Sequence, residues 1–167
     1  MAEIFEVYQR GNLFFSNKEE AFQLVNQSSF GELKSGKVVY SLYEALYLLE
    51  NKKIKVISTN KNISFETLIK KAENEIYAVF KDLRDKGNIV KEGLKFGTDF
   101  RVYEKGQKPG KSHAKYLAYV IQGNKSINIK DFSAKTRIAH STHKILLLAI
   151  VDSEEDITYY EINWKSS

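Results

Sequence analysis

Residues 93–121, GLKFGTDFRVYEKGQKPGKSHAKYLAYVI, decide the fold of the second half of the chain when they are read with residues 137–152, RIAHSTHKILLLAIVD. Alternating apolar and polar residues predict a strand that ends at Tyr103, and a second alternating strand begins at Lys115. The glycines and the single proline between these strands predict a loop over 105–112.

The apolar run ILLLAIV, residues 145–151, does not alternate and predicts a strand that is buried on both faces. The preceding AKTRIAHSTHK predicts two or three helical turns, which would place Arg137, Ser141 and Lys144 on one side. ITYYEINW, residues 157–164, predicts the last strand of this part of the chain.

Three side chains that can carry or transfer a proton stand where a predicted strand meets a loop. They are Tyr103, His113 and Lys144. Within the first strand, Tyr103 shares one face with Arg101, because alternate residues of a strand point the same way. A sheet holds such side chains in fixed relation while the loops leave them open to a substrate.

Composition narrows the possible chemistry. The chain has 167 residues, which suits one domain or two small lobes. It has no cysteine and only three histidines, which disfavours a disulfide framework, a thiolate centre or a histidine-rich metal site. We expect neither a metal nor a cofactor. No apolar stretch reaches the roughly 18–20 residues that a membrane span needs, and the start lacks a signal-peptide core, so we expect a cytoplasmic protein.

The positive charge is unevenly distributed. The net charge of +5 falls entirely within residues 76–167, whereas residues 1–75 are neutral. The segment 101–115 contains five basic residues and one acid, Glu104. Such a cationic surface favours a polyanionic partner, and nucleic acid is the commonest one. A merely solvated basic face is the alternative.

The first part of the chain predicts a small mixed α/β lobe. Strands are expected over 3–9, 12–15, 38–40 and 53–58, a helix over 18–27, and loops over 28–37 and 59–62. A second helix follows Ser41, which has capping-box spacing to Glu44. Nothing in this lobe resembles a catalytic group.

A long helix is predicted from Ser64 to about Lys86, with apolar residues recurring every three or four positions and Gly87 placed for a left-handed cap. It would connect the neutral lobe to the basic one. We therefore expect two lobes, residues 1–70 and residues 71–167.

The residue types favour cleavage of RNA without a metal. RNA supplies its own nucleophile, the ribose 2′-hydroxyl beside the scissile phosphate. Cleavage then needs a base, an acid for the departing 5′-oxygen, and positive charge near phosphorus. Histidine suits the acid and lysine suits the phosphate, whereas tyrosine serves as the base when nearby cations stabilise its phenolate.

The same segments carry a family resemblance. GLKFGTDFRVYEKG, SHAKYL and RIAHSTHKILLLAIVD, followed by TYYEI, resemble the catalytic lobe of archaeal tRNA-intron endonucleases over residues 80–162, and SLYEALYLL resembles part of the family's N-terminal lobe. The resemblance implies a C-terminal restriction-endonuclease-like lobe with a central mixed sheet flanked by helices. It also implies cleavage of precursor tRNA at bulge-helix-bulge junctions, giving 2′,3′-cyclic phosphate and 5′-hydroxyl ends. Tyr103, His113 and Lys144 would act as base, acid and transition-state stabiliser.

Further roles are implied by the family alone. Arg137 matches one member of a pair of side chains that clamp a flipped base between facing subunits, and Trp164 is a candidate for the other. Asp131, in the polar stretch 123–133, is the candidate contact to a neighbouring subunit. Because two bulges must be cut, the resemblance implies a homotetramer or a heterotetramer with a structural subunit.

Two alternatives from other classes remain at this point. One is a non-catalytic RNA-binding or structural subunit, in which Tyr103, His113, Lys144 and Arg137 are ordinary surface or strand residues. The other is a metal-dependent DNA nuclease on the same kind of sheet, with Asp99 and Glu104 as ligands.

Overall fold

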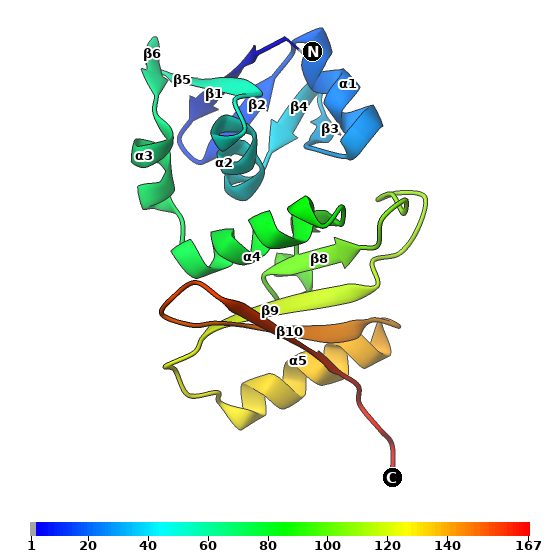
Figure 1. The fold of residues 1–167 in the computed structure, drawn as a ribbon. Helices are drawn as coiled ribbons and strands as arrows, with labels where there is room; N and C mark the ends of the chain where they lie inside the picture. The colour runs from blue at the N-terminus through cyan, green and yellow to red at the C-terminus, as the bar shows by residue number, and fades with distance from the viewer. Residues whose placement is uncertain (1–2) are drawn as a thin grey trace. The chain divides into compact units, whose positions relative to one another are not determined.

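The computed structural model describes residues 3–167, which form two compact units that divide between Asn74 and Glu75. Each unit is built around its own sheet, and each sheet contains both parallel and antiparallel pairs (Figure 1). The predicted fold class is therefore confirmed: a small mixed α/β lobe precedes a lobe with a central mixed sheet and flanking helices.

The N-terminal unit contains a six-stranded sheet in the order β3-β4-β2-β1-β5-β6. Its strands are β1 (Phe5–Arg10), β2 (Leu13–Ser16), β3 (Glu32–Lys34), β4 (Lys37–Tyr40), β5 (Ile54–Ser58) and β6 (Lys61–Ile63). Only β1 and β5 run parallel to each other. The prediction of loops where β3 and β6 lie was wrong. Both are edge strands of three residues, too short for an alternating pattern to reveal them.

Helices cover one face of this sheet. They are α1 (Glu19–Ser28), α2 (Leu42–Glu50) and α3 (Phe65–Leu68), which a 3-10 turn, η1 (Ile69–Lys71), continues. In β1, Phe5, Val7 and Gln9 are buried, whereas Glu6 and Tyr8 between them are half-buried. The sheet therefore has one core face and one partly open face.

The predicted capping box at the start of α2 is confirmed. The Ser41 hydroxyl accepts a hydrogen bond from the Glu44 amide at 3.2 Å, and the Glu44 carboxylate accepts from the Ser41 amide at 2.9 Å. The other carboxylate oxygen of Glu44 accepts from the Gly31 amide at 3.0 Å. Since Glu44 is buried, these amide donors compensate for its lost hydration and tie α2 to the segment before β3.

The prediction of one long helix from Ser64 to Lys86 was wrong. Ser64 caps the short α3, and the chain is extended at Ala72, with φ −105° and ψ 159°. A separate helix, α4, spans Asn74–Asp85. Leu68 is buried in the first unit and Val79 in the second, so the continuous apolar stripe serves two different cores. Periodicity detects the stripe but cannot detect the extended residue that divides it.

The C-terminal unit has a five-stranded sheet in the order β11-β10-β9-β8-β7. Its strands are β7 (Ile89–Glu92), β8 (Phe100–Tyr103), β9 (Tyr116–Gln122), β10 (Ile145–Val151) and β11 (Ile157–Ile162), and a 3-10 turn, η2 (Leu94–Phe96), joins β7 to β8. The two central strands, β9 and β10, are parallel, and the other pairs are antiparallel. As predicted, β10 is largely buried, because both of its edges are paired and both faces are covered.

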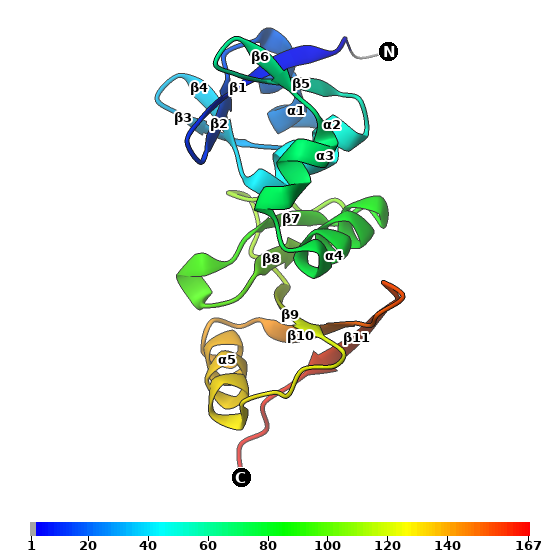
Figure 2. The same ribbon diagram turned by 90° about the vertical axis from the view of Figure 1, so that its left-hand side faces the viewer.

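Two helices cover opposite faces of this sheet, and Figure 2 shows α4 and α5 on its two sides. Helix α5 (Ile129–Ser141) packs through Ala139 against Leu117 and Leu146. On the other face, the rings of Phe80 in α4 and Phe100 in β8 lie 5.5 Å apart. As predicted, Gly87 ends α4 in the left-handed conformation, with φ +90°.

Among residues 3–167, none of the helices has the length and apolarity that a bilayer crossing requires.

We expect Ser41→Ala to lower the free energy of unfolding by about 0.5–2 kcal/mol, because it removes the acceptor for the Glu44 amide. Urea denaturation of the full chain measures the change. Ser64→Ala is the matched control, since Ser64 caps α3 with the same geometry at an exposed site and should have the smaller effect. A larger effect of Ser64→Ala would contradict this interpretation.

Candidate active site

Tyr103 lies at the end of β8, with its ring in the interior and its hydroxyl beside a cation. Its side chain is only 4% exposed and packs with Ile89 and Ala114. Arg101 lies on the same face of the strand, as predicted, and its Nη1 donates a long hydrogen bond of 3.4 Å to the Tyr103 hydroxyl oxygen. Because the phenol oxygen accepts this bond, its own proton remains available to another acceptor.

His113 lies at the end of the loop between β8 and β9 and is exposed. The loop is held before it by Ser112, whose amide and hydroxyl both donate to the Lys108 carbonyl at 3.0 Å. After it, Ala114 is buried against Tyr103. The segment that carries the imidazole is therefore held by Ser112 before His113 and by Ala114 after it. Ala114 packs with Tyr103.

Lys144 directly precedes β10, and its side chain is half-buried. Its Nζ donates to the Thr142 carbonyl at 3.0 Å and lies 5.1 Å from the centre of the Phe96 ring. The prediction that Lys144 shares a helix side with Arg137 and Ser141 was wrong. Helix α5 ends at Ser141, and the left-handed backbone of His143, with φ +57°, turns the chain before the lysine.

Strand pairing brings these three segments to one end of the sheet. Tyr116 of β9 is paired with Ile145 of β10 on one side and with Val102 of β8 on the other. Tyr103 follows Val102 and Lys144 precedes Ile145, so both lie one residue further toward the same end of the sheet. Two strand spacings, about 10 Å, therefore separate their backbones. His113 enters from the loop that leads into the strand between them.

The electrostatics of this end of the sheet are strongly positive. The pKa of Lys144 is lowered from its usual value, first by desolvation and then by repulsion from Arg101 and Lys95. Arg101, which donates to the Tyr103 hydroxyl, thus belongs to a cluster of three cations with Lys144 and Lys95. Like charges held together in a partly desolvated site favour the binding of an anion.

Lys95 and Phe96 were not singled out from the sequence. Both belong to η2, and both lie next to Lys144 in the structure. Lys95 is one of the excess basic residues of this half of the chain, but no spacing pattern in the sequence predicts that it lies near Lys144. Only the packing of η2 beside α5 reveals the connection.

Comparison with known proteins identifies the family. A family model described as "tRNA intron endonuclease, catalytic C-terminal domain" matches residues 73–159, and the model of the corresponding N-terminal domain matches residues 6–69. The chain belongs to the tRNA intron endonuclease family. It is 42% identical to a tRNA-splicing endonuclease of Thermococcus onnurineus and 40% identical to one of Pyrococcus abyssi, in each case over 98% of both chains. It is also 41% identical to a tRNA-splicing endonuclease of Methanothermobacter thermautotrophicus, over 86% of this chain and 87% of the relative.

The family resemblance expected from the sequence is thus confirmed, and it extends over both units. The matched C-terminal segment contains Tyr103, His113, Lys144 and Arg137, whereas Trp164 lies beyond its end.

The two candidate base-clamp residues lie near the same part of α5. Arg137 is exposed on the helix, and Trp164 follows β11 with 47% of its surface exposed. The Trp164 ring contacts the edge of the His140 ring, with the centroids 4.5 Å apart. His140 is three residues after Arg137 in α5, so the side chains of Arg137 and His140 are neighbours on the helix surface. Their role in binding a base stays a prediction.

Asp131 is exposed, but it already has partners within the chain. It accepts hydrogen bonds from Lys135 Nζ at 2.6 Å and from the Tyr119 hydroxyl at 3.1 Å, and the bonds from Lys135 and then Tyr119 lower the pKa of its carboxyl. The expectation of a polar loop over 123–133 was partly wrong, because α5 begins at Ile129 and Asp131 lies in its first turn. A subunit contact through Asp131 would have to share it with Lys135.

Both carboxylates of the metal-nuclease alternative have partners within the chain. Asp99 accepts from the Val120 amide at 2.8 Å, and Glu104 pairs with Lys115 at 2.6 Å. Within the part of the chain that the structure describes, no three His, Cys, Asp or Glu side chains are grouped so that they could hold a metal ion. The candidate catalytic side chains and Arg101 thus supply phenol, imidazole, ammonium and guanidinium groups, and the Glu104 carboxylate at the same end of the sheet is paired with Lys115.

We expect Lys144→Met to raise the melting temperature at neutral pH, because it removes an ammonium ion that desolvation and two cations destabilise. The folded-state pKa of Lys144 lies below that of the unfolded chain, so between the two values the unfolded chain binds more protons and wild-type stability rises with pH. The advantage of the variant should thus shrink as the pH approaches the ordinary lysine pKa. Differential scanning calorimetry across this range measures it.

The control is Lys125→Met, which changes an exposed lysine in the loop after β9. It should leave the melting temperature nearly unchanged. If the increase in melting temperature caused by Lys144→Met became larger as the pH rises, the lowered pKa of Lys144 would be contradicted.

Proposed function

We propose that this chain is a tRNA-splicing endonuclease that cleaves precursor tRNA at bulge-helix-bulge junctions without a metal ion. The observation that carries the proposal is the pairing of β8, β9 and β10, which brings the segments that carry Tyr103, His113 and Lys144 to one end of the C-terminal sheet, where Lys144 lies among other cations. Membership of the tRNA intron endonuclease family supports precursor tRNA as the substrate. We expect the enzyme to act in the cytoplasm.

In the proposed reaction, Tyr103 accepts the proton of the ribose 2′-hydroxyl, and the 2′-oxygen attacks the adjacent phosphorus. The bond between phosphorus and the 5′-oxygen breaks, and His113 gives a proton to that leaving oxygen. The products are a 2′,3′-cyclic phosphate and a 5′-hydroxyl. Arg101 supports the role of Tyr103 because its guanidinium donates to the phenol oxygen and so accompanies the negative charge of a phenolate.

Lys144 would stabilise the additional negative charge that develops on the non-bridging phosphate oxygens. Its ammonium is partly desolvated, which strengthens its interaction with an anion relative to a fully hydrated lysine. Arg101 and Lys95 add positive charge nearby. We propose Arg137 and Trp164 as residues that stack on an unpaired base, since both side chains are exposed and have planar groups.

One chain has one such set of side chains, whereas excision of an intron needs two cuts. We therefore propose a symmetric assembly of four subunits, either identical or including a structural partner, that presents two sites at a fixed distance. Light scattering of the purified chain tests whether it forms this assembly alone.

Tyr103→Phe and His113→Ala should each lower single-turnover cleavage of a bulge-helix-bulge RNA by about 10²–10⁴-fold, and Lys144→Ala by about 10²–10³-fold. Binding of the RNA should persist, because none of the three changes removes the remaining basic surface. Tyr160→Phe and Lys125→Ala are matched controls at exposed positions and should cleave normally. Normal cleavage by all three triad variants would reject the proposed mechanism.

The same assay separates the proposal from its alternatives. Cleavage should continue in excess EDTA, and an RNA with 2′-deoxyribose at both junctions should not be cut, because it lacks the attacking hydroxyl. End analysis should find the cyclic phosphate. Cutting of an all-deoxy substrate with dependence on a divalent ion would support the metal-nuclease alternative, and binding without any cleavage would support a structural subunit.

We expect Lys95→Ala to move the alkaline limb of the pH–rate profile to higher pH. Repulsion from Lys95 contributes to the lowered pKa of Lys144, so its removal allows Lys144 to keep its proton at higher pH. The proposed stabiliser acts only when charged. The profile of cleavage rate against pH measures the shift. Lys125→Ala is the control for the loss of one positive charge. An alkaline limb displaced to lower pH in Lys95→Ala would contradict the role of Lys144.

A further inference from the structure

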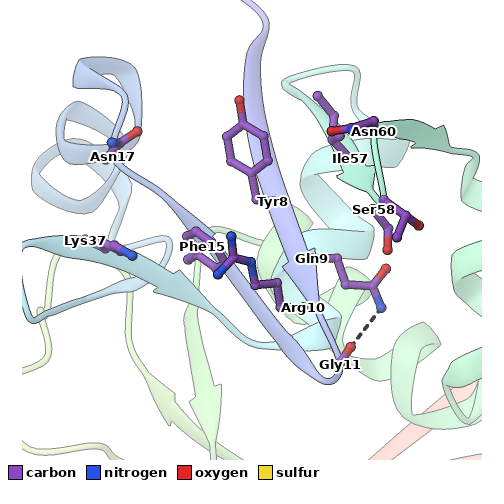
Figure 3. Close-up of a pocket in the computed structure, with 11 residues that line it drawn as sticks. Tyr8, Gln9, Arg10, Gly11, Phe15, Asn17, Lys37, Ile57, Ser58 and Asn60 are labelled. Carbon is purple, nitrogen blue, oxygen red and sulfur yellow. Dashed lines mark hydrogen bonds between the residues drawn. The ribbon is translucent and has the colours of Figure 1, made fainter.

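The N-terminal unit has a pocket that the proposed chemistry does not use. It has a volume of about 550 Å³, within the range of ligand sites, and lies on the sheet face that α1 and α2 do not cover (Figure 3). Strands β1, β2, β4 and β5 and the turn after β5 line it. We call it the N-terminal pocket. The side chains that matter most are Tyr8, Arg10, Phe15, Asn17, Lys37 and Asn60.

Two aromatic rings form its floor. Tyr8 of β1 is paired in register with Phe15 of β2, so the rings are cross-strand neighbours on the same face. Their centroids are 6.1 Å apart and their planes are inclined by 34°. Ile57 of β5 is the register partner of Tyr8 on its other side. The floor is therefore an apolar strip across three neighbouring strands, on which a planar group can stack against a ring.

Two cations lie over the Phe15 ring. The Arg10 guanidinium is 5.8 Å from the ring centre, and the Lys37 ammonium is 4.7 Å from it. Among residues 3–167, neither side chain forms an ion pair. The ring thus holds two positive charges over the pocket without neutralising them. This arrangement is prepared for an anion such as a phosphate.

The rim supplies amide groups. Asn17 follows β2, and Asn60 belongs to the two-residue turn between β5 and β6, where Thr59 and Asn60 have φ of +47° and +60°. Figure 3 shows Asn17 and Asn60 on opposite sides of the Tyr8 ring. An asparagine amide both donates and accepts hydrogen bonds, as the edge of a nucleobase does.

One acid lies on this face close to the rings. Glu6 accepts a hydrogen bond from the Tyr8 hydroxyl at 2.8 Å, and its register partner on β5 is Lys55. The bond to Glu6 fixes the Tyr8 ring and raises the pKa of the Tyr8 phenol, so Tyr8 remains neutral at physiological pH. Tyr8 therefore offers a stacking surface, not a negative charge.

We propose that the N-terminal pocket binds an unpaired nucleotide of the precursor tRNA. Its base stacks on Tyr8, and a flanking phosphate contacts Arg10 and Lys37. Sheet surfaces bind single-stranded RNA by combining aromatic rings with nearby cations, and here the two cations form no ion pair among residues 3–167. The identity of the RNA rests on the proposed function, whereas the chemistry of the pocket does not.

The test uses the full chain and a precursor tRNA with 2′-deoxyribose at both junctions, which the proposed reaction cannot cut. The double variant Arg10→Ala/Lys37→Ala should weaken binding and lower the slope of log Kd against log salt concentration by roughly 0.7–0.9, the value expected for the loss of one phosphate contact. Tyr8→Ala should weaken binding by roughly 5- to 100-fold, as expected for one stacked base. Tyr8→Phe keeps the ring but loses the bond to Glu6, so it should weaken binding less than Tyr8→Ala does.

The matched control is Lys70→Ala/Lys71→Ala, which removes the same charge from exposed positions of the same unit outside the pocket. It should change the salt slope by less than half as much. Equal slopes for the two double variants, or wild-type binding by Tyr8→Ala, would overturn the proposal, and the pocket would then be a candidate for a protein partner. Circular dichroism melting of each variant excludes loss of fold as the cause of weak binding.

Cleavage of the ordinary precursor separates this inference from the proposed function. If both are right, the pocket variants raise KM and leave kcat within about twofold, because they remove binding that does not change in the transition state. If precursor cleavage fails in the wild type while the pocket variants still weaken RNA binding, the proposed reaction is wrong and the pocket assignment stands. If the wild type cleaves and the pocket variants have normal KM, the pocket assignment is wrong.

Discussion

The parallel pairing of β9 with β10 is the constraint on which the C-terminal unit depends. It sets Tyr116 beside Ile145, which are 29 positions apart, and a parallel pair requires a crossover, which α5 provides. The same register places Lys144 beside the loop that carries His113, and the antiparallel β8 adds Tyr103 from the other side of β9. A slip of one residue in either pairing would turn every side chain of the shifted strand to the opposite face. The arrangement of the candidate site is therefore a consequence of sheet register.

Much of this arrangement could be predicted from the sequence, because its signals are local. The end of β8 is marked by alternation followed by glycine and proline, and β10 is marked by an apolar run of seven residues. Those signals place Tyr103, His113 and Lys144 at strand ends. Register and strand order are not local, so the sequence alone does not show which strand ends are neighbours. For the same reason the contacts of Lys144 with Lys95 and Phe96 were not predicted.

The two errors in the helices have a common physical cause. A helical stripe of apolar residues shows that side chains are buried, but it does not show which core buries them. Leu68 and Val79 continue one stripe but belong to different units, and extended backbone at Ala72 separates them. Likewise, Lys144 has helical spacing from Arg137, yet α5 ends at Ser141 because the chain must turn to enter β10. In both cases tertiary packing overrides a periodic pattern.

The clustering of cations in the C-terminal unit is unfavourable without an anion, and the proposed reaction would make use of this at a bound phosphate. Repulsion among Lys144, Arg101 and Lys95, together with desolvation, destabilises the charged form of Lys144 in the free protein. A phosphate between them relieves the repulsion, and the extra charge of the transition state relieves it further. Because the sheet already holds these groups in position, little reorganisation is needed when the charge develops. The stability that the fold loses at this site thus becomes preferential binding of the more negative state.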